Sequence, residues 1–462
     1  MSDHLPPSDG RRYRSRLPRE HILGDDFNMW SVLKGGIGKE LTKVPMPVSF
    51  NEPLSFLQRM AELMEYSELL QLAAGQEDSV SRMELVAAFA VSGLACNWGR
   101  TAKPFNPLLG ETYELERNGF RMVCEQVSHH PPVSAFHAEG DQYQFHGSVH
   151  PKLKFLGRSL EISPRGTLAV ELPGHEETYT WSNVNCYVHN VVVGKLWVEQ
   201  QGTMTITNHK TGDTCTLVFK SSSSSKSSHR VEGFIQDRKK TRHRFLYGKW
   251  TEYLRSMDIE SYENNLSLSE QRLGSSQETE RRAGLSPIHG PRKMFSRLNS
   301  ITTAPFRSHS DRELNVEHDS PDDPSAEGAL SRSSSGHSLG SAGSRTLWQA
   351  EPPPVDAHKY YHFTRFAMSL NELLPDMELC RTDSRLRPDI RALESGDTEK
   401  AGAEKARLED KQRRAGKARS KRKQAWTPRY FQLCKSADTN IEDWTYMNNF
   451  WEEKNTTDVD IF

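Results

Sequence analysis

Residues 120–132 read FRMVCEQVSHHPP, a strand pattern that ends in two adjacent histidines and two prolines. In a regular strand, neighbouring side chains point to opposite faces. His129 and His130 can therefore reach one ligand only where the strand ends or bends. Pro131 and Pro132 predict that end, because proline cannot donate to a ladder of hydrogen bonds and favours extended geometry in the residue before it. The pattern indicates a site for an anion.

Short alternating runs rich in Val, Thr, Tyr and Trp surround this stretch, from about Gly110 to Leu254. Turns with Gly, Pro and Asn separate them. Strands at such regular spacing favour a meander that closes or nearly closes into a barrel, and a large barrel encloses a cavity. The clearest expected strands cover residues 143–149, 167–172, 178–181, 191–198, 203–208 and 215–219.

Three helices are expected outside the strand region. Apolar residues at helical spacing predict helices over 54–72 and 81–96. A third, from Asp397 to about Gln424, begins with acidic residues and ends with basic ones, an order that suits the helix macrodipole. Its Lys405, Glu409 and Arg413 are spaced four apart and share one face. That face is either an ordinary solvated surface with salt bridges or part of an anion site.

An apolar stripe at helical spacing lies near the amino terminus, and it is formed by Phe27, Trp30, Leu33, Ile37 and Leu41. Core packing and a mobile lid both explain it. We expect a disordered basic tail over 1–22, a β-barrel domain over 23–257 with this segment at about 26–44, a disordered Ser-rich insertion over 258–345, and the remainder of the domain over 346–462. Ser300 is a candidate phosphorylation site, because Arg297 precedes it by three residues.

The bulk composition names no partner, since 60 basic and 61 acidic residues leave a net charge of −1. The six cysteines form no CxxC pair, which favours a reduced, cytoplasmic protein. The longest apolar run, residues 85–96, is far below the roughly 20 residues of a membrane span. No hydrophobic amino-terminal segment is present, so we expect neither secretion nor a transmembrane anchor.

The motifs of common enzymes are missing or incomplete. Ser128 and His129 are sequence neighbours without a GxSxG elbow, and no HExxH motif occurs. The run GGIGK at residues 35–39 has the wrong spacing for a phosphate loop, and Glu40 stands where Ser or Thr is required. Catalysis is therefore not expected.

Five stretches carry a family resemblance. The chain is similar to the oxysterol-binding protein-related family of lipid transfer proteins over residues 26–257 and 346–450, nearest to the subgroup of oxysterol-binding protein-related proteins 1 and 2. The stretches are EQVSHHPP at 125–132, KPFNPLLGETYE at 103–114, YGKW at 247–250, RLRPD at 385–389 and LEDKQR at 408–413.

The resemblance implies a mainly β, α+β fold: a near-complete antiparallel β-barrel around a lipid tunnel, with an amino-terminal lid and helices and a carboxy-terminal helical subdomain. It implies exchange of a sterol for a phosphoinositide between membranes, with transient peripheral membrane contact, no nucleic acid, no cofactor and no metal. The 26–44 segment would be the lid. The phosphoinositide site would consist of Lys103, Asn106, His129, His130, Lys405, Glu409 and Arg413.

A function of another class stays open beside lipid transfer. The barrel could sense sterol or phosphoinositide while residues 258–345 recruit a signalling partner according to their phosphorylation. The residues do not identify the tunnel lipid, and phosphatidylserine remains an alternative to a sterol.

Overall fold

The computed structural model describes residues 13–21, 46–221, 229–267, 343–435, 440–454 and 459–462. Contacts divide the chain into a unit of residues 1–259 and 343–462 and a second unit of residues 260–342. The first unit contains the elements described below. The predicted lid residues Phe27, Trp30, Leu33, Ile37 and Leu41, and the candidate phosphosite Ser300, lie outside the described residues.

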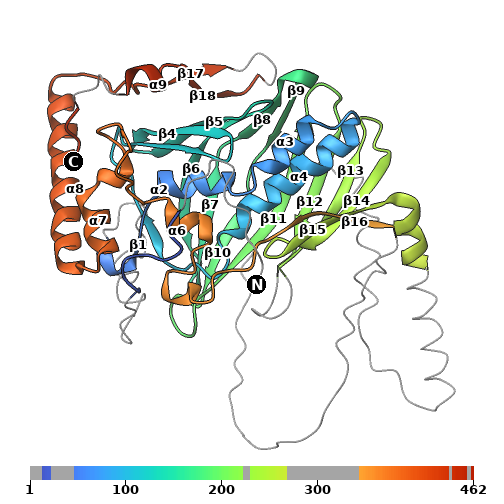
Figure 1. Ribbon diagram of the computed structural model, residues 1–462, viewed down its shortest axis with the longest axis horizontal. Coiled ribbons are helices and arrows are strands. Elements are labelled where there is room, and N and C mark those ends of the chain that lie inside the picture. The colour runs from blue at the N-terminus through green and yellow to red at the C-terminus, as the bar shows by residue number, and fades with distance from the viewer. Residues whose placement is uncertain (1–12, 22–45, 222–228, 268–342, 436–439, 455–458) are drawn as a thin grey trace, which may run out of the picture. The chain divides into compact units, whose positions relative to one another are not determined.

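One antiparallel sheet of 14 strands dominates this unit (Figure 1). Most strands that neighbour each other in the sheet also follow each other in sequence, so the chain runs largely as a meander from β3 at one edge to β16 at the other; the pairs β7–β10, β6–β8 and β9–β11 depart from this order. The strands are β3 (Thr112–Arg117), β4 (Phe120–His129), β5 (Pro132–Glu139), β6 (Gln144–Phe155), β7 (Ser159–Arg165), β8 (Leu168–Leu172), β9 (Glu177–Trp181), β10 (Asn185–His189), β11 (Trp197–Asn208), β12 (Thr214–Phe219), β13 (Arg230–Gln236), β14 (Arg242–Lys249), β15 (Tyr253–Asp258) and β16 (Ser344–Gln349).

The predicted α+β class and antiparallel meander are confirmed. Within the described part of the chain, β3 and β16 do not pair with each other, so no hydrogen-bonded seam closes the barrel. Strand β6 pairs with two successive strands, β7 at residues 150–155 and β8 at residues 144–147. Gly166 separates these two strands, and a Cβ at this position would lie 1.9 Å from the carbonyl oxygen of Ser148. The close approach of the backbone at residue 166 to the backbone at residue 148 therefore requires glycine.

Helices cover one face of the sheet (Figure 1). One of them, α4, contacts β11, β13, β15 and β16, and its apolar side chains enter the main core. Asp78 accepts a hydrogen bond from the backbone N–H of Ser81, and this N-cap explains where the helix begins. The helices are α2 (Phe56–Ala61), α3 (Glu68–Ala74), α4 (Ser79–Ala95), α6 (Arg365–Ser369), α7 (Pro388–Glu394), α8 (Thr398–Lys421) and α9 (Phe450–Glu453).

Strand β4 is buried on both faces. Met122 and Cys124 belong to the main core, while the alternate residues Val123 and Val127 pack in a second apolar cluster with the carboxy-terminal segment. That segment forms a two-stranded sheet of β17 (Phe431–Lys435) and β18 (Glu442–Tyr446), and β18 contacts β5 and β6. In Figure 1 it lies along β4 and β5. The carboxy-terminal part of the chain therefore completes the core of the sheet domain.

The expected helix over 54–72 is wrong as a single element. Residues 51–55 form strand β1 (Asn51–Ser55), which pairs in parallel with β2 (Lys103–Phe105). Helix α2 begins only after Ser55, because the side chain of Gln58 accepts from the Ser55 N–H at 2.7 Å and Ser55 Oγ accepts from the Leu57 N–H in a capping box. By contrast, the helices expected over 81–96 and from 397 to 424 are confirmed as α4 and α8.

The expected strand over 191–198 is also wrong, since residues 190–196 connect β10 to β11. Asn190 has a φ of +62° and Gly194 a φ of +100°, and the Asn190 side-chain amide donates to the Lys195 carbonyl at 2.9 Å. This turn chemistry overrides the strand propensity of three successive valines.

Residues 13–21 were expected to belong to a disordered tail, but they pack against the domain instead. Leu17 is buried, and Arg14 Nε donates to the Met368 carbonyl at 2.6 Å. No helix in the described ranges is both long enough and apolar enough to cross a membrane.

Candidate functional site

The two histidines lie at the turn between β4 and β5. His129 is the last residue of β4 and Pro132 the first of β5, which confirms that the strand ends there. The side chain of Gln126 donates to the Ser128 carbonyl, and Ser128 Oγ donates to the Pro131 carbonyl, both at 2.7 Å. These bonds hold the turn, so that the rings of His129 and His130 lie with centroids 4.5 Å apart.

Lys103 comes from the short strand β2 and is half-buried. Its Nζ donates to Asn106 Oδ1 at 2.7 Å. Burial and the nearby Lys405 and Arg387 lower the pKa of Lys103 to about 8, while Glu409 opposes that shift. Removal of water and the proximity of other cations both disfavour the charged ammonium. An anion placed beside Lys103 would reverse this effect.

The third group of side chains comes from helix α8, which lies beside α7 in Figure 1. Asp397 caps its amino terminus by accepting from the Lys400 N–H at 2.9 Å. Lys405 Nζ donates to Glu409 Oε1 at 2.8 Å and to the Met46 carbonyl at 3.0 Å. Arg413 approaches the same carboxylate at 3.9 Å, and 62% of its side chain is exposed. Glu409 therefore orients both cations of this helix face.

The pKa of His129 is lowered from its ordinary value to about 4. Burial is the main cause, and the neighbouring His130 adds to it; the Pro107 carbonyl and Glu409 act in the opposite direction. Glu409 thus acts on Lys103, Lys405 and His129 together. The turn, strand β2 and helix α8 consequently meet around one carboxylate.

A buried carboxylate supports the loop between β2 and β3. Glu111 Oε2 accepts from the Leu108 N–H and from Arg387 Nη1, both at 2.8 Å, and Glu111 Oε1 accepts from Ser55 Oγ and Ser384 Oγ, both at 2.6 Å. Arg387 also donates to the Asn106 carbonyl at 2.9 Å. This network sets the position of Asn106 and, through it, of Lys103.

The structure brings together every predicted site residue within its described ranges: Lys103, Asn106, His129, His130, Lys405, Glu409 and Arg413. Sequence reasoning missed the residues that position them. Glu111 and Arg387 lie inside two of the five stretches that resemble the family, and this position could have identified them as supporting residues. Gln412 lies in a third stretch and contacts His129, and nothing in its local pattern distinguishes it from other polar residues of the helix.

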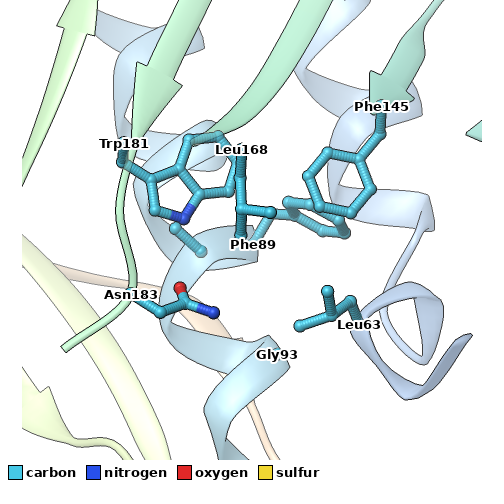
Figure 2. Close-up of a pocket in the computed structure, with 8 residues that line it drawn as sticks. Leu63, Phe89, Gly93, Phe145, Leu168, Trp181 and Asn183 are labelled. Atoms are coloured by element: carbon cyan, nitrogen blue, oxygen red, sulfur yellow. The ribbon is translucent and has the colours of Figure 1, made fainter. Parts of the chain in front are cut away.

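A small pocket lies between helix α4 and the sheet (Figure 2). The space between its lining side chains does not admit a water molecule. The rings of Phe89 and Phe145 meet edge to face at 5.0 Å, and Phe145 stacks on Trp181 at 5.8 Å. The lining side chains therefore fill most of the space at this point of the core. Its lining residues are Leu63, Phe89, Ala90, Gly93, Phe145, Leu168, Trp181 and Asn183.

The chain is similar in sequence to known proteins of one family. The family model described as oxysterol-binding protein matches residues 28–455. Oxysterol-binding protein-related protein 1 of Homo sapiens is 44% identical over 98% of the chain, and oxysterol-binding protein-related protein 2 of Mus musculus is 44% identical over the same share. The chain spans 44% of the length of the first relative and 88% of the second.

Solved structures agree in fold. The crystal structure of the Osh1 ORD domain in complex with cholesterol matches with a TM-score of 0.75 and 30% identity, covering 99% of this chain and 96% of that one. The Osh3 ORD in complex with PI(4)P from Saccharomyces cerevisiae matches with a TM-score of 0.70 and 26% identity, covering 98% and 99%. Both of these domains therefore share the antiparallel meander and the helical layers of this chain. The chain belongs to the oxysterol-binding protein family. This confirms the family membership that the five sequence stretches indicated.

Proposed function

We propose that this protein is a non-enzymatic lipid transfer protein that binds a sterol and a phosphoinositide and exchanges them between membranes. The observation that carries the proposal is the group of cationic and histidine side chains around Glu409, at the meeting point of three segments. Solved relatives support it, since the Osh1 domain is described with cholesterol and with ergosterol and the Osh3 domain with PI(4)P.

The phosphoinositide headgroup would bind at Lys103, Asn106, His129, His130, Lys405, Glu409 and Arg413. A phosphomonoester carries about −1.5 to −2 charges near neutral pH, and cationic donors form short, strong hydrogen bonds to it. Lys103 favours such a ligand, because an anion would offset the burial and repulsion that now lower its pKa. Glu409 would keep Lys405 and Arg413 oriented or accept from an inositol hydroxyl.

The sterol would occupy the apolar interior between the sheet and the helices. Removal of roughly 400 Å² of sterol surface from water is worth on the order of 10 kcal/mol before association costs. The space beside Phe89 does not admit a water molecule, so the side chains there leave no room for such a ligand. We therefore expect side chains around Leu63 and Phe89 to move when a sterol binds.

A vesicle transfer assay tests the proposal. Donor vesicles carry either a fluorescent sterol or a phosphatidylinositol monophosphate, and its arrival in acceptor vesicles is followed over time. The variant His129→Ala/His130→Ala should lose phosphoinositide extraction and keep sterol extraction. His243→Ala is the matched control, because this histidine is partly exposed and faces Asp237 at 3.4 Å, away from the proposed site.

Two outcomes would contradict the proposal. If the unaltered protein moves neither lipid, transfer is excluded, and a lipid-regulated scaffold becomes the better explanation. If the double variant loses both lipids equally while its melting temperature is unchanged, the histidines do not select the phosphoinositide. The proposal also includes a cytoplasmic location with transient, peripheral membrane contact, and phosphorylation at Ser300.

A further inference from the structure

Gln412 connects three segments at the proposed headgroup site. It lies on helix α8, three residues after Glu409. Its side-chain Oε1 accepts from the backbone N–H of Leu109 at 2.7 Å, and its Nε2 lies 2.8 Å from Nε2 of His129. One amide group therefore links the helix to the loop before β3 and to the end of β4.

The partners determine the direction of both hydrogen bonds. The backbone N–H of Leu109 can only donate, so the amide oxygen of Gln412 must face it. The amide nitrogen then faces His129, and an amide nitrogen can only donate. His129 Nε2 must consequently accept, which places the ring proton on Nδ1 and leaves the imidazole neutral.

The surroundings of the ring agree with this neutral form. Nδ1 is buried and makes no hydrogen bond of good geometry to the described residues, while the nearby Pro107 carbonyl favours a proton there. The ionisable groups that act on the ring are His130, next to it on the turn, and Glu409, on helix α8. Burial and His130 outweigh Glu409, and the pKa of His129 falls to about 4.

We propose that Gln412 is a positioning residue that holds His129 in the neutral Nδ1–H form while the site is empty, so that Nε2 can donate to a phosphomonoester only after the ring gains a proton and separates from Gln412. The choice of a phosphomonoester as the ligand rests on the function proposed above. The switch follows from hydrogen-bond chemistry. Once Nε2 carries a proton, two donors face each other and the bond to Gln412 is lost.

Binding of a headgroup should therefore take up a proton. A dianionic phosphate beside the ring favours the imidazolium and raises the pKa of His129 above its value in the empty site. At pH values between the His129 pKa of the empty site and that of the complex, the affinity for the headgroup should fall as pH rises. The fall should be up to about tenfold per pH unit. The phosphate itself titrates near pH 6. The informative quantity is thus the difference in proton uptake between the unaltered protein and a variant whose residue 129 cannot titrate.

Nuclear magnetic resonance of the empty protein, labelled with 15N in its histidine rings, tests the positioning role without any lipid. The His129 signals are identified by their loss in His129→Gln. In the unaltered protein we expect the Nδ1–H tautomer and a pKa well below 6.5. In Gln412→Glu a carboxylate can accept from both Leu109 and a protonated Nε2, so the pKa of His129 should rise by about one unit or more.

Gln412→Leu serves as the second variant, because it removes both hydrogen bonds without adding charge. It should release the tautomer preference and raise the pKa less than Gln412→Glu does. Melting temperatures verify that both variants fold. An Nε2–H tautomer in the unaltered protein, or an unchanged pKa in Gln412→Glu, would refute the positioning role.

Calorimetry with a short-chain phosphatidylinositol monophosphate, in two buffers of different ionisation enthalpy, then measures proton uptake at pH 7. The unaltered protein should take up more protons than His129→Gln, which has no imidazole to titrate. Equal uptake would refute the coupling. Absence of any binding would instead count against the proposed function, while the tautomer and pKa in the empty protein still decide the role of Gln412.

Discussion

Glu111 offers the sharpest test of how the site is supported, because its carboxylate is fully buried and accepts four hydrogen bonds. In Glu111→Ala, the Leu108 N–H and one N–H of Arg387 lose their acceptor in a buried environment. An orphaned buried donor costs about 1–3 kcal/mol, and removal of one member of a buried ion pair about 3–5 kcal/mol. Arg387 keeps Asp389, at 2.7 Å, as a second partner. We therefore expect Glu111→Ala to lower the free energy of unfolding by about 3–5 kcal/mol.

Glu111→Gln is the matched control, because it keeps the shape of the side chain. Its oxygen can face Leu108 and Arg387, and its amide can donate to the hydroxyls of Ser55 and Ser384, which rotate to accept. Only the charge is lost, so the expected cost is about 1–2 kcal/mol. Since the free energy of unfolding of a domain is typically about 5–15 kcal/mol, the two variants should differ clearly.

Urea denaturation, followed by circular dichroism, measures both costs. Phosphoinositide extraction by folded Glu111→Ala should also weaken, because Arg387 and the loop that carries Asn106 lose their common partner. The reasoning is refuted if the two variants lose equal stability, or if Glu111→Ala costs less than about 1 kcal/mol.

Two further predictions concern the sheet. Gly166→Ala should destabilise the protein by about 1–3 kcal/mol more than Gly119→Ala in thermal melts, because a Cβ at residue 166 would lie 1.9 Å from the Ser148 carbonyl oxygen while one at residue 119 meets no atom within 4 Å. Equal melting temperatures would show that the strands tolerate the Cβ. His137 and Arg121 lower the pKa of Glu139 to about 2, so its contribution to stability is present above the unfolded value of about 4.3 and is lost as pH falls toward 2. Stability measured between pH 5 and 3 should decline less steeply in Glu139→Gln, and identical slopes would contradict this.

Much of the local structure was predictable from the sequence. Alternating residues indicated the antiparallel meander, and Pro131 and Pro132 indicated the end of β4 at His129. Helix α8 was predictable as well, because Asp397 caps it and its charges follow the macrodipole. The errors arose where local rules competed. The capping box at Ser55 divided an apolar helical pattern, and the turn chemistry of Asn190 interrupted a run of valines.

The supporting residues of the site were not predictable in the same way. Arg387 and Glu111 are separated by more than two hundred residues in sequence and share a hydrogen bond of 2.8 Å. Leu17 becomes buried although the surrounding segment is polar. In both cases the stabilising partner belongs to a distant part of the chain, and no window of neighbouring residues contains it.

By itself, the sequence determined the fold class, the strand that presents the two histidines and the helix face that carries Lys405, Glu409 and Arg413, because periodicity, capping and proline act over a few neighbouring residues. Only the tertiary structure decided that these pieces meet, and that Gln412 donates to His129 from 283 positions away. That contact determines which nitrogen of the ring holds the proton. The protonation state of a buried imidazole depends on its desolvation and its partners, and these exist only after the chain has folded.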